Sequence, residues 1–350
     1  MNERRKATIY DIAEATGFSV GTVNRALNDK PRIKAETKKL IMDTAAALSY
    51  KANPAAQGLR RAQIKIGVVM YCPVLEYVSS IARGIANAAS DLEKFNVEID
   101  VYQLEYSTNE ICRAETVELL KRFRDEKYSG VALFSSSTNQ EIEDIRQTVD
   151  ELTESGIPVA TIANDIPQST RALYVGIDAF TAGRMAAEML WLTCPHSHVA
   201  LLTNSIDSEV NRGYVAGFHD FAGFECFSGI SMYEHLDEPE LVLRETKRMI
   251  NENPELKGIY MTSASANIAC EYIRANESKS YRIITTDLLR DTPMFLKNGT
   301  ASATIFQDPY RQGRNAVQYL YHYILDRSDG GVHHIVPSIL LSSNVAAYEF

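Results

Sequence analysis

The spacing of apolar residues along the chain changes at about residue 62, which divides the chain into two parts. In residues 8–28, apolar side chains recur at spacings of three and four, which predicts two short amphipathic helices. Ile12 and Ala13 mark the buried stripe of the first helix, and Val23 and Ala26 mark that of the second. The N-terminal part of the chain is therefore expected to be a small helical unit.

Helix-capping residues indicate that these two helices form a helix-turn-helix motif. Thr8 followed by Asp11 is a capping-box pattern, which satisfies free amide groups in the first turn. Gly17 can take the left-handed conformation that ends a helix, and Ser19 can cap the next one. This arrangement presents the first turn of the second helix outward, as a recognition helix in a DNA major groove requires.

A third helix and a tether follow. The third helix is expected over residues 35–48, with Ile41, Ala45 and Leu48 on its buried stripe. An Asn-Pro pair at residues 53–54 then begins a short helix of about seven residues. Because so short a helix is marginal alone, we expect it to be ordered only when something holds it.

From residue 64 onward, apolar runs rich in β-branched residues alternate with amphipathic segments. The expected strands cover residues 65–70, 97–104, 130–134, 158–163, 198–203, 227–233, 258–261, 283–286, 303–306 and 336–341. Continuous apolar strands separated by helices indicate parallel sheets covered on both faces. The pattern runs through twice, which predicts an α/β body with two doubly wound lobes.

The expected domain boundaries follow from these elements. They are a head over residues 1–52, a hinge over 53–62, and a body over 63–350 with an N-lobe of about 63–164 and 308–333 and a C-lobe of about 165–307 and 334–350. Two such lobes place the carboxyl ends of their strands around a common cleft, where ligands bind in these folds.

Polar residues at the strand ends are the candidate cleft residues. They are Tyr71, Ser135, Asp165, Asp178, Arg212, Tyr233, Ser263, Asp287 and Gln307. Carboxylates, an amide, an arginine and aromatic faces suit a polyhydroxylated ligand, because hydroxyl groups both donate and accept. For a single member such as Asp165, a solvated loop carboxylate is an equally good interpretation.

Charge is distributed unevenly along the 350 residues. The net charge is −9, but residues 1–61 hold 12 Lys and Arg against 6 Asp and Glu. Only the front of the chain therefore favours a polyanionic partner. With no long apolar run and five scattered cysteines, we expect a cytoplasmic protein with reduced thiols, no secretion signal and no membrane span.

Enzymatic and metal-binding motifs are missing from the sequence. It contains no GxGxxG, GxxxxGK[ST], GxSxG or HExxH, so we expect neither catalysis nor a cofactor. The histidines at 196 and 198 and at 333 and 334 lie in expected loops without a converging ligand set, so no metal is expected.

The motifs together resemble those of the lac-repressor and galactose-repressor family of bacterial transcription regulators. The matching stretches are TIYDIAEATGFSVGTVNRALN, TKKLIMDTAAALSYKANPAAQGLR, IGVV, VGIDAFTAGRMAAEML, NRGYVAGF, TTDL and IFQDPYRQGRNAV, in the family's order and spacing. The resemblance implies a dimer on a pseudo-palindromic operator, with a body similar to periplasmic sugar-binding proteins. It also implies allosteric control by a sugar, sugar phosphate or polyol.

The resemblance assigns roles to individual residues. The positions that would contact DNA or anchor the head are Thr8, Tyr10, Ser19, Val20, Gly21, Thr22, Asn24, Arg25, Asn28, Arg32, Tyr50, Asn53, Ala56 and Leu59. Among these, Val20, Gly21, Asn24 and Arg25 match base-reading positions, and Leu59 matches a leucine inserted into the minor groove. The implied effector positions are Asp178, Arg212, Asp287 and Gln307, with Tyr77 and Tyr233 nearby.

Departures from the family pattern leave several alternatives open. Leu75-Glu76-Tyr77-Val78 stands where Asn-Pro-Phe-Phe is common, and Ser263-Ala264-Ser265 replaces the usual Asn-Asp. The effector, its action as inducer or corepressor, and the operator sequence are therefore not fixed. The absence of a leucine-heptad tail argues against a tail-mediated tetramer. The rival interpretations are a solute-binding protein and a doubly wound enzyme.

Overall fold

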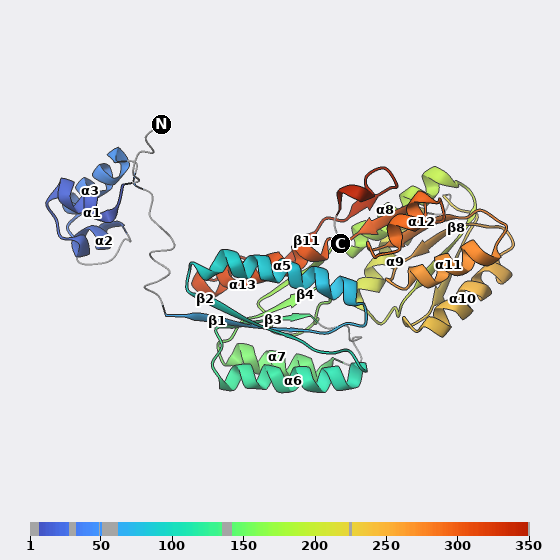
Figure 1. The fold of residues 1–350 in the computed structure, drawn as a ribbon, viewed down its shortest axis with the longest axis horizontal. Coiled ribbons are helices and arrows are strands. Elements are labelled where there is room, and N and C mark those ends of the chain that lie inside the picture. The colour runs from blue at the N-terminus through green and yellow to red at the C-terminus, as the bar shows by residue number, and fades with distance from the viewer. Residues whose placement is uncertain are drawn as a thin grey trace. The chain divides into compact units, whose positions relative to one another are not determined.

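The computed structural model describes residues 7–27, 33–48, 50, 62–134, 142–223 and 226–348. The chain divides into two compact units, a head that ends at residue 62 and a body that begins at residue 63 (Figure 1). Within the described residues, no helix is both long enough and apolar enough to cross a membrane.

The head contains three helices around one small core. They are α1 (Ile9–Thr16), α2 (Val20–Leu27) and α3 (Ala35–Ala47). The core residues are Ile12, Val23, Ala26, Ile41 and Ala45. The stripe predicted for the third helix is confirmed at Ile41 and Ala45 but is wrong at Leu48, which is 38% exposed because the helix has already ended at Ala47.

The caps of the head form as the sequence predicts. The Thr8 amide donates to Asp11 Oδ2 at 2.6 Å, and the Asp11 amide donates back to Thr8 Oγ1 at 3.4 Å. Gly17 ends α1 in the left-handed conformation with φ of 69°. The Thr22 amide donates to Ser19 Oγ at 3.2 Å. The orientation of α2 is thus fixed at its first turn.

The first lobe of the body is a six-stranded parallel sheet. In spatial order its strands are β11 (Gly331–Ile335), β5 (Leu173–Ile177), β4 (Val159–Ile162), β3 (Gly130–Phe134), β1 (Ile64–Met70) and β2 (Val97–Gln103). Figure 1 shows α5 (Leu75–Glu93) and α13 (Pro309–Asp326) on one face of the sheet, with α6 (Asn109–Asp125) and α7 (Glu143–Glu154) on the other.

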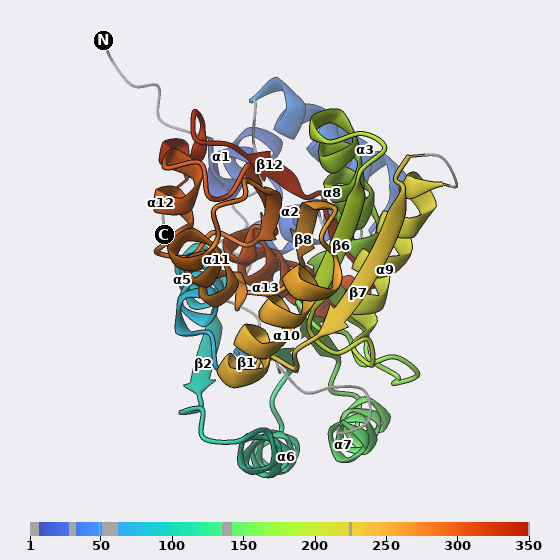
Figure 2. The ribbon, with the colours of Figure 1, turned by 90° about the vertical axis from the view of Figure 1, so that its right-hand side faces the viewer.

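The second lobe has the same design with one antiparallel strand. Its strand order is β12 (Ser338–Leu340), β10 (Ala303–Phe306), β9 (Arg282–Thr286), β8 (Leu256–Met261), β6 (His198–Thr203) and β7 (Gly229–Glu234), and β12 runs against β10. The helices are α8 (Ala179–Thr193), α9 (Glu209–Ala222), α10 (Pro239–Glu252), α11 (Ala266–Asn276) and α12 (Thr292–Lys297), with a 3₁₀ turn at Val345–Ala347. Figure 2 shows α8 and α9 on one face and α10 and α11 on the other.

The prediction of two doubly wound α/β lobes is confirmed, with three corrections. The first crossover between the lobes follows β5 at Ile177, so the boundary expected near residue 165 is wrong. Strands β5 and β11 were not predicted, and two histidines interrupt the apolar pattern of β11. The last strand pairs antiparallel, which an apolar run alone does not reveal.

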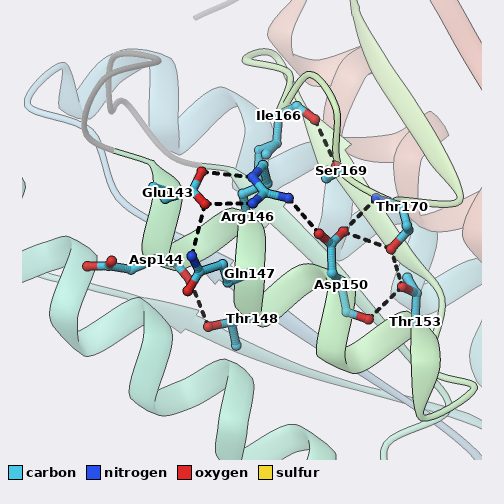
Figure 3. A network of polar contacts seen from close by, with 10 residues as sticks. All are labelled: Glu143, Asp144, Arg146, Gln147, Thr148, Asp150, Thr153, Ile166, Ser169 and Thr170. Atoms are coloured by element: carbon cyan, nitrogen blue, oxygen red, sulfur yellow. Dashed lines mark hydrogen bonds and ion pairs between the residues drawn. The ribbon is translucent and has the colours of Figure 1, made fainter.

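A polar network stiffens the outer face of the first lobe (Figure 3). Arg146 on α7 pairs with Glu143 and Asp150, with closest distances of 2.6 and 2.8 Å. Asp150 in turn accepts from the amide and hydroxyl of Thr170, which lies in the loop between β4 and β5. The network joins α7 to that loop on the lobe's surface.

Candidate DNA-binding surface and effector cleft

The first turn of α2 forms the candidate DNA-reading surface. Gly21 and Arg25 are exposed, whereas Val20, Thr22 and Asn24 are half-buried. Ser19 Oγ lies 2.9 Å from Thr22 Oγ1, so these two hydroxyl groups stabilise each other at the start of the helix. One exposed face of α2 therefore carries a guanidinium group next to a glycine that admits close approach of a ligand.

Two tyrosines of the predicted set lie in different surroundings on the head. Tyr10 is 65% exposed on α1, where it is available to a partner. Tyr50 packs against the head core, and its amide donates to the Ala45 carbonyl at 2.8 Å. Thr8 is committed to its cap with Asp11. Five other predicted DNA-binding residues lie outside the described residues: Asn28, Arg32, Asn53, Ala56 and Leu59.

Asp287, at the end of β9, is the most constrained of the predicted effector residues. Its φ is 75°, in the left-handed region, and its side chain is buried. Oδ1 has no hydrogen-bond partner within the described structure. Burial raises the pKa of this carboxyl group to about 7, which the nearby Gln307 amide partly offsets. An ionisable group in this state is a strong candidate for ligand contact.

Two polar side chains, Tyr77 and Gln312, link the first lobe to the crossover after β10. Tyr77 on α5 donates its hydroxyl to Gln312 Oε1 at 3.4 Å, and Gln312 Nε2 donates to the Gln307 carbonyl at 2.9 Å. Burial raises the pKa of Tyr77, so its hydroxyl remains a donor. Gln312 was missed from the sequence because it lies one turn inside a helix rather than at a strand end.

A pocket of about 220 Å³ opens beside these residues. It is lined by Leu75, Glu76, Tyr77, Ser79, Ser80, Arg83, Asp287, Leu288, Leu289, Phe306 and Pro309. Its walls come from α5 in the first lobe, the loop after β9 in the second, and the crossover after β10. The lobes thus enclose space at the carboxyl ends of their strands, which is where ligands bind in such folds.

A second polar cluster lies at the ends of β6, β7 and β8. His235 is buried, its Nδ1 accepts from the Asp237 amide at 3.0 Å, and its Nε2 lies 3.3 Å from Ser263 Oγ. Asp237 Oδ1 accepts from Ser265 Oγ at 2.8 Å. Burial lowers the pKa of His235. Of these residues only Ser263 was predicted, because the others lie in loops whose folding cannot be read from strand ends.

Four predicted cleft residues are occupied by other contacts. Arg212 donates to the Ile206 and Asp207 carbonyls and pairs with Glu209. Asp165 forms a two-pronged ion pair with Arg171.

Asp178 caps α8 by accepting from the Thr181 amide at 2.9 Å. Tyr233 points away from the strand ends, since its hydroxyl donates to Glu252 at the end of α10 at 3.0 Å. Tyr71 is buried after β1, and Ser135 lies outside the described residues.

Metal binding finds no support in the described residues. They contain no group of three or more His, Cys, Asp or Glu side chains placed to hold an ion. Among the cysteines, burial raises the pKa of Cys72 and Cys270 to about 12, which keeps both as unreactive thiols.

The structure combines a helix-turn-helix head with a two-lobed body that has a periplasmic-binding-protein-like fold. A model of bacterial regulatory proteins, lacI family, matches residues 8–53, and a model of the periplasmic binding protein domain matches residues 66–328. The chain therefore carries a helix-turn-helix domain of the lacI family and belongs, over its body, to the periplasmic binding protein domain family.

Relatives in this family are moderately similar. The chain is 26% identical to catabolite control protein A of Priestia megaterium over 59% of its length and 57% of that protein. It is 26% identical to the lactose operon repressor of Escherichia coli (strain K12) over 71% of its length and 65% of that protein. In both comparisons the match spans less than two thirds of the relative's length.

Solved structures share the body's fold. A glucose-galactose binding protein from Geobacillus stearothermophilus superposes with a TM-score of 0.71 at 23% identity, covering 81% of this chain and 99% of that one. An arabinose binding protein, AraP, from the same organism gives a TM-score of 0.68 at 20% identity, covering 83% and 100%. At this identity the likeness concerns the fold alone.

Proposed function

We propose that the protein is a ligand-responsive transcription regulator, most simply a repressor, that binds a pseudo-palindromic operator as a homodimer in the cytoplasm. The observation that carries this proposal is a capped helix-turn-helix on the same chain as a two-lobed binding body. No catalytic role is assigned, since the relatives named above are regulators. A solute-binding protein would have no use for the basic head.

DNA reading is assigned to the exposed face of α2. Arg25 can pair with guanine through two hydrogen bonds, Asn24 can pair with adenine, and Val20 can contact a thymine methyl group. Thr22 and Ser19 lie at the helix start, where amides and hydroxyls bind phosphate. The family resemblance adds the remaining positions in and after the head, of which Leu59 would enter the minor groove from the hinge.

Control is assigned to the cleft between the lobes. An effector that contacts Asp287 and Gln307 from one lobe and Tyr77 from the other would favour a closed body. Closure would change the spacing of the two hinges in a dimer and hence the affinity for the operator. By linkage, an effector that weakens operator binding must bind the DNA complex less tightly. The ligands expected from the hydroxyl-matching groups are sugars, sugar phosphates or polyols.

Salt dependence of operator binding tests the proposal. An operator would first be selected from a randomised palindromic library with the full chain, and its dissociation constant measured by fluorescence anisotropy between about 50 and 200 mM salt. Each Lys or Arg contact with phosphate contributes a slope of about −0.9 to the log–log plot, so the affinity should fall steeply.

Arg25→Ala should weaken binding at every salt concentration and lower the discrimination between operator variants. Lys247→Ala, a cation on α10 of the body, is the matched control and should leave the affinity unchanged. A failure to select any preferred sequence, or an affinity that does not change with salt, would sink the proposal.

A further inference from the structure

The position of the Asp287 carboxylate is imposed by the fold. Its backbone amide donates to the Ile305 carbonyl at 2.9 Å, and its carbonyl accepts from Thr304 Oγ1 at 2.6 Å. Both contacts come from β10, the neighbouring strand, and hold the residue in its left-handed conformation. These contacts hold the backbone of Asp287 where its side chain lines the pocket.

The charge of Asp287 has no cationic partner in the described structure. Arg212, which the sequence places near the cleft, pairs with Glu209, and Arg171 pairs with Asp165. Arg83 lies at the exposed side of the pocket, 6.0 Å from the Tyr310 ring. The undescribed segments of the body, residues 135–141, 224–225 and 349–350, contain no Lys or Arg at all.

A second carboxylate adds to the negative potential at the same edge of the sheet. Asp237 raises the pKa of Asp287 further by charge repulsion, and its own two oxygens accept only neutral donors, from Asn204 and Ser265. His235 does not neutralise it, because burial disfavours the imidazolium and Nδ1 accepts the Asp237 amide. Leu236 and Asp237 both have positive φ, which fixes this loop.

We propose that the effector carries an ammonium group, as an amino sugar or amino alcohol does, and that this group pairs with Asp287. The inference rests on the proposed function, in which the cleft is the effector site. A neutral polyol would leave the carboxylate charge uncompensated, whereas an ammonium group supplies both the missing donor to Oδ1 and the missing positive charge. A phosphate group would add negative charge beside two carboxylates. The rings of Tyr77 and Phe306 in the same pocket suit a cation further.

The preference for an ammonium group can be tested on the full-length protein with sets of ligands that differ only in one functional group. Thermal shift and calorimetry would compare D-glucosamine, D-glucose and glucose 6-phosphate, then the same sets built on galactose and mannose, and then serinol against glycerol. Within any set that binds, we expect the amine to bind about tenfold or more tightly than its hydroxyl analogue, since hydrogen bonds to charged groups are markedly stronger than neutral ones. The phosphate should be the weakest member.

Two variants test whether the preference for the amine arises from the carboxylates of the cleft. Asp287→Asn keeps the side-chain shape and should abolish the preference for the amine, and Asp237→Asn should reduce it. Asp125→Asn, an exposed carboxylate on α6 whose side chain is 69% exposed, removes the same charge elsewhere and should leave the preference unchanged.

The outcomes separate this inference from the proposed function. A neutral or phosphorylated compound that binds more tightly than its amine would overturn the inference while leaving a ligand-responsive regulator intact. A panel in which no amine binds also contradicts it. Operator binding by the wild type and by Asp125→Asn, measured without ligand, reports on the proposed function alone and should not differ between the two proteins.

Discussion

At the scale of single residues, burial decides how Asp287 responds to pH. A carboxyl group ordinarily ionises near 3.8, but in the folded chain the pKa of Asp287 is about 7. Between these values the folded state binds more protons than the unfolded state, so the free energy of unfolding falls as pH rises. The stabilising contribution is complete below about pH 4 and lost as pH passes 7.

Asp287→Asn should therefore be more stable than the wild type at pH 8 and lose that advantage toward pH 4. One pKa unit corresponds to about 1.4 kcal/mol, so the difference at pH 8 should reach a few kcal/mol. The titratable groups that interact with Asp287 are Asp237, Cys72, Tyr77, Tyr214 and Tyr260. Burial raises the pKa of the thiol and of the three phenols, so these four groups stay protonated across this range.

Thermal unfolding of both proteins across pH 4 to 8 checks this expectation, with Asp125→Asn as the surface control. A difference in melting temperature that stays constant across the range would show that burial does not raise this pKa.

Some of the predicted cleft residues lie where strands end, whereas the side chains of others make contacts elsewhere. Asp287 and Gln307 directly follow β9 and β10, Ser263 lies just after the end of β8, and the carboxyl end of a parallel strand points to the cleft. Tyr233 also stands near a strand end, but its long side chain reaches back to Glu252. The contacts of His235 depend on two successive residues in the left-handed conformation. This conformation is rare for residues other than glycine, so the sequence did not predict it.

At the scale of elements, glycines set how closely helices approach. A Cβ at Gly84 on α5 would overlap the Tyr310 carbonyl oxygen on α13, and one at Gly313 would overlap the Ile81 carbonyl oxygen. A Cβ at Gly183 or Gly217 would likewise overlap a carbonyl oxygen where α8 packs against α9. Backbone oxygens cannot move aside as a flexible side chain can, so these contacts require glycine.

Gly84→Ala should lower the free energy of unfolding of the body by about 3 kcal/mol, at the upper end of the usual cost of overpacking. The alanine would otherwise favour the helix by up to about 1 kcal/mol, so a net loss isolates the steric term. Ser90→Ala, on an exposed position of α5, is the control and should change stability little. Urea unfolding of the three proteins distinguishes them, and equal midpoints would refute close packing of α5 against α13.

Most elements could be predicted because their signals are local. The local sequence is enough to predict the capping box at Thr8, the left-handed glycine at residue 17 and the long apolar strands. The short strand β5 and the histidine-bearing β11 are held by their neighbours in the sheet rather than by their own pattern. Their assignment, and with it the first crossover, depends on contacts far apart in the sequence.

At the scale of the whole molecule, the chain crosses between the lobes three times, after β5, β10 and β11. One further contact joins the lobes directly. Glu76 Oε2 on α5 accepts from the Arg290 amide at 2.8 Å, and Glu76 Oε1 lies 3.9 Å from Arg290 Nε. Glu76 stands in the segment where the chain departs from its family, so the sequence did not indicate this contact.

Glu76→Ala should shift the ligand-free body toward open conformations, because it removes both the hydrogen bond to the Arg290 amide and the ion pair. An exposed ion pair contributes about 0–1 kcal/mol, and a hydrogen bond to a charged acceptor adds to it, so the open-to-closed ratio should rise roughly threefold to tenfold. Small-angle X-ray scattering of the ligand-free protein would report this as a larger radius of gyration.

Two further variants separate the hydrogen bond from the charge pair. Arg290→Ala keeps the backbone amide that Glu76 binds and loses only the long ion pair, whose arginine is 87% exposed, so it should have a smaller effect than Glu76→Ala. Glu76→Gln keeps a hydrogen-bond acceptor but loses the charge, so its effect on the open-to-closed ratio should lie between those of the two alanine variants. If Arg290→Ala opened the body as far as Glu76→Ala, the side-chain charge rather than the amide contact would hold the lobes together. Because closure is coupled to ligand binding, the variants should follow the same order in effector affinity, with Glu76→Ala the weakest binder.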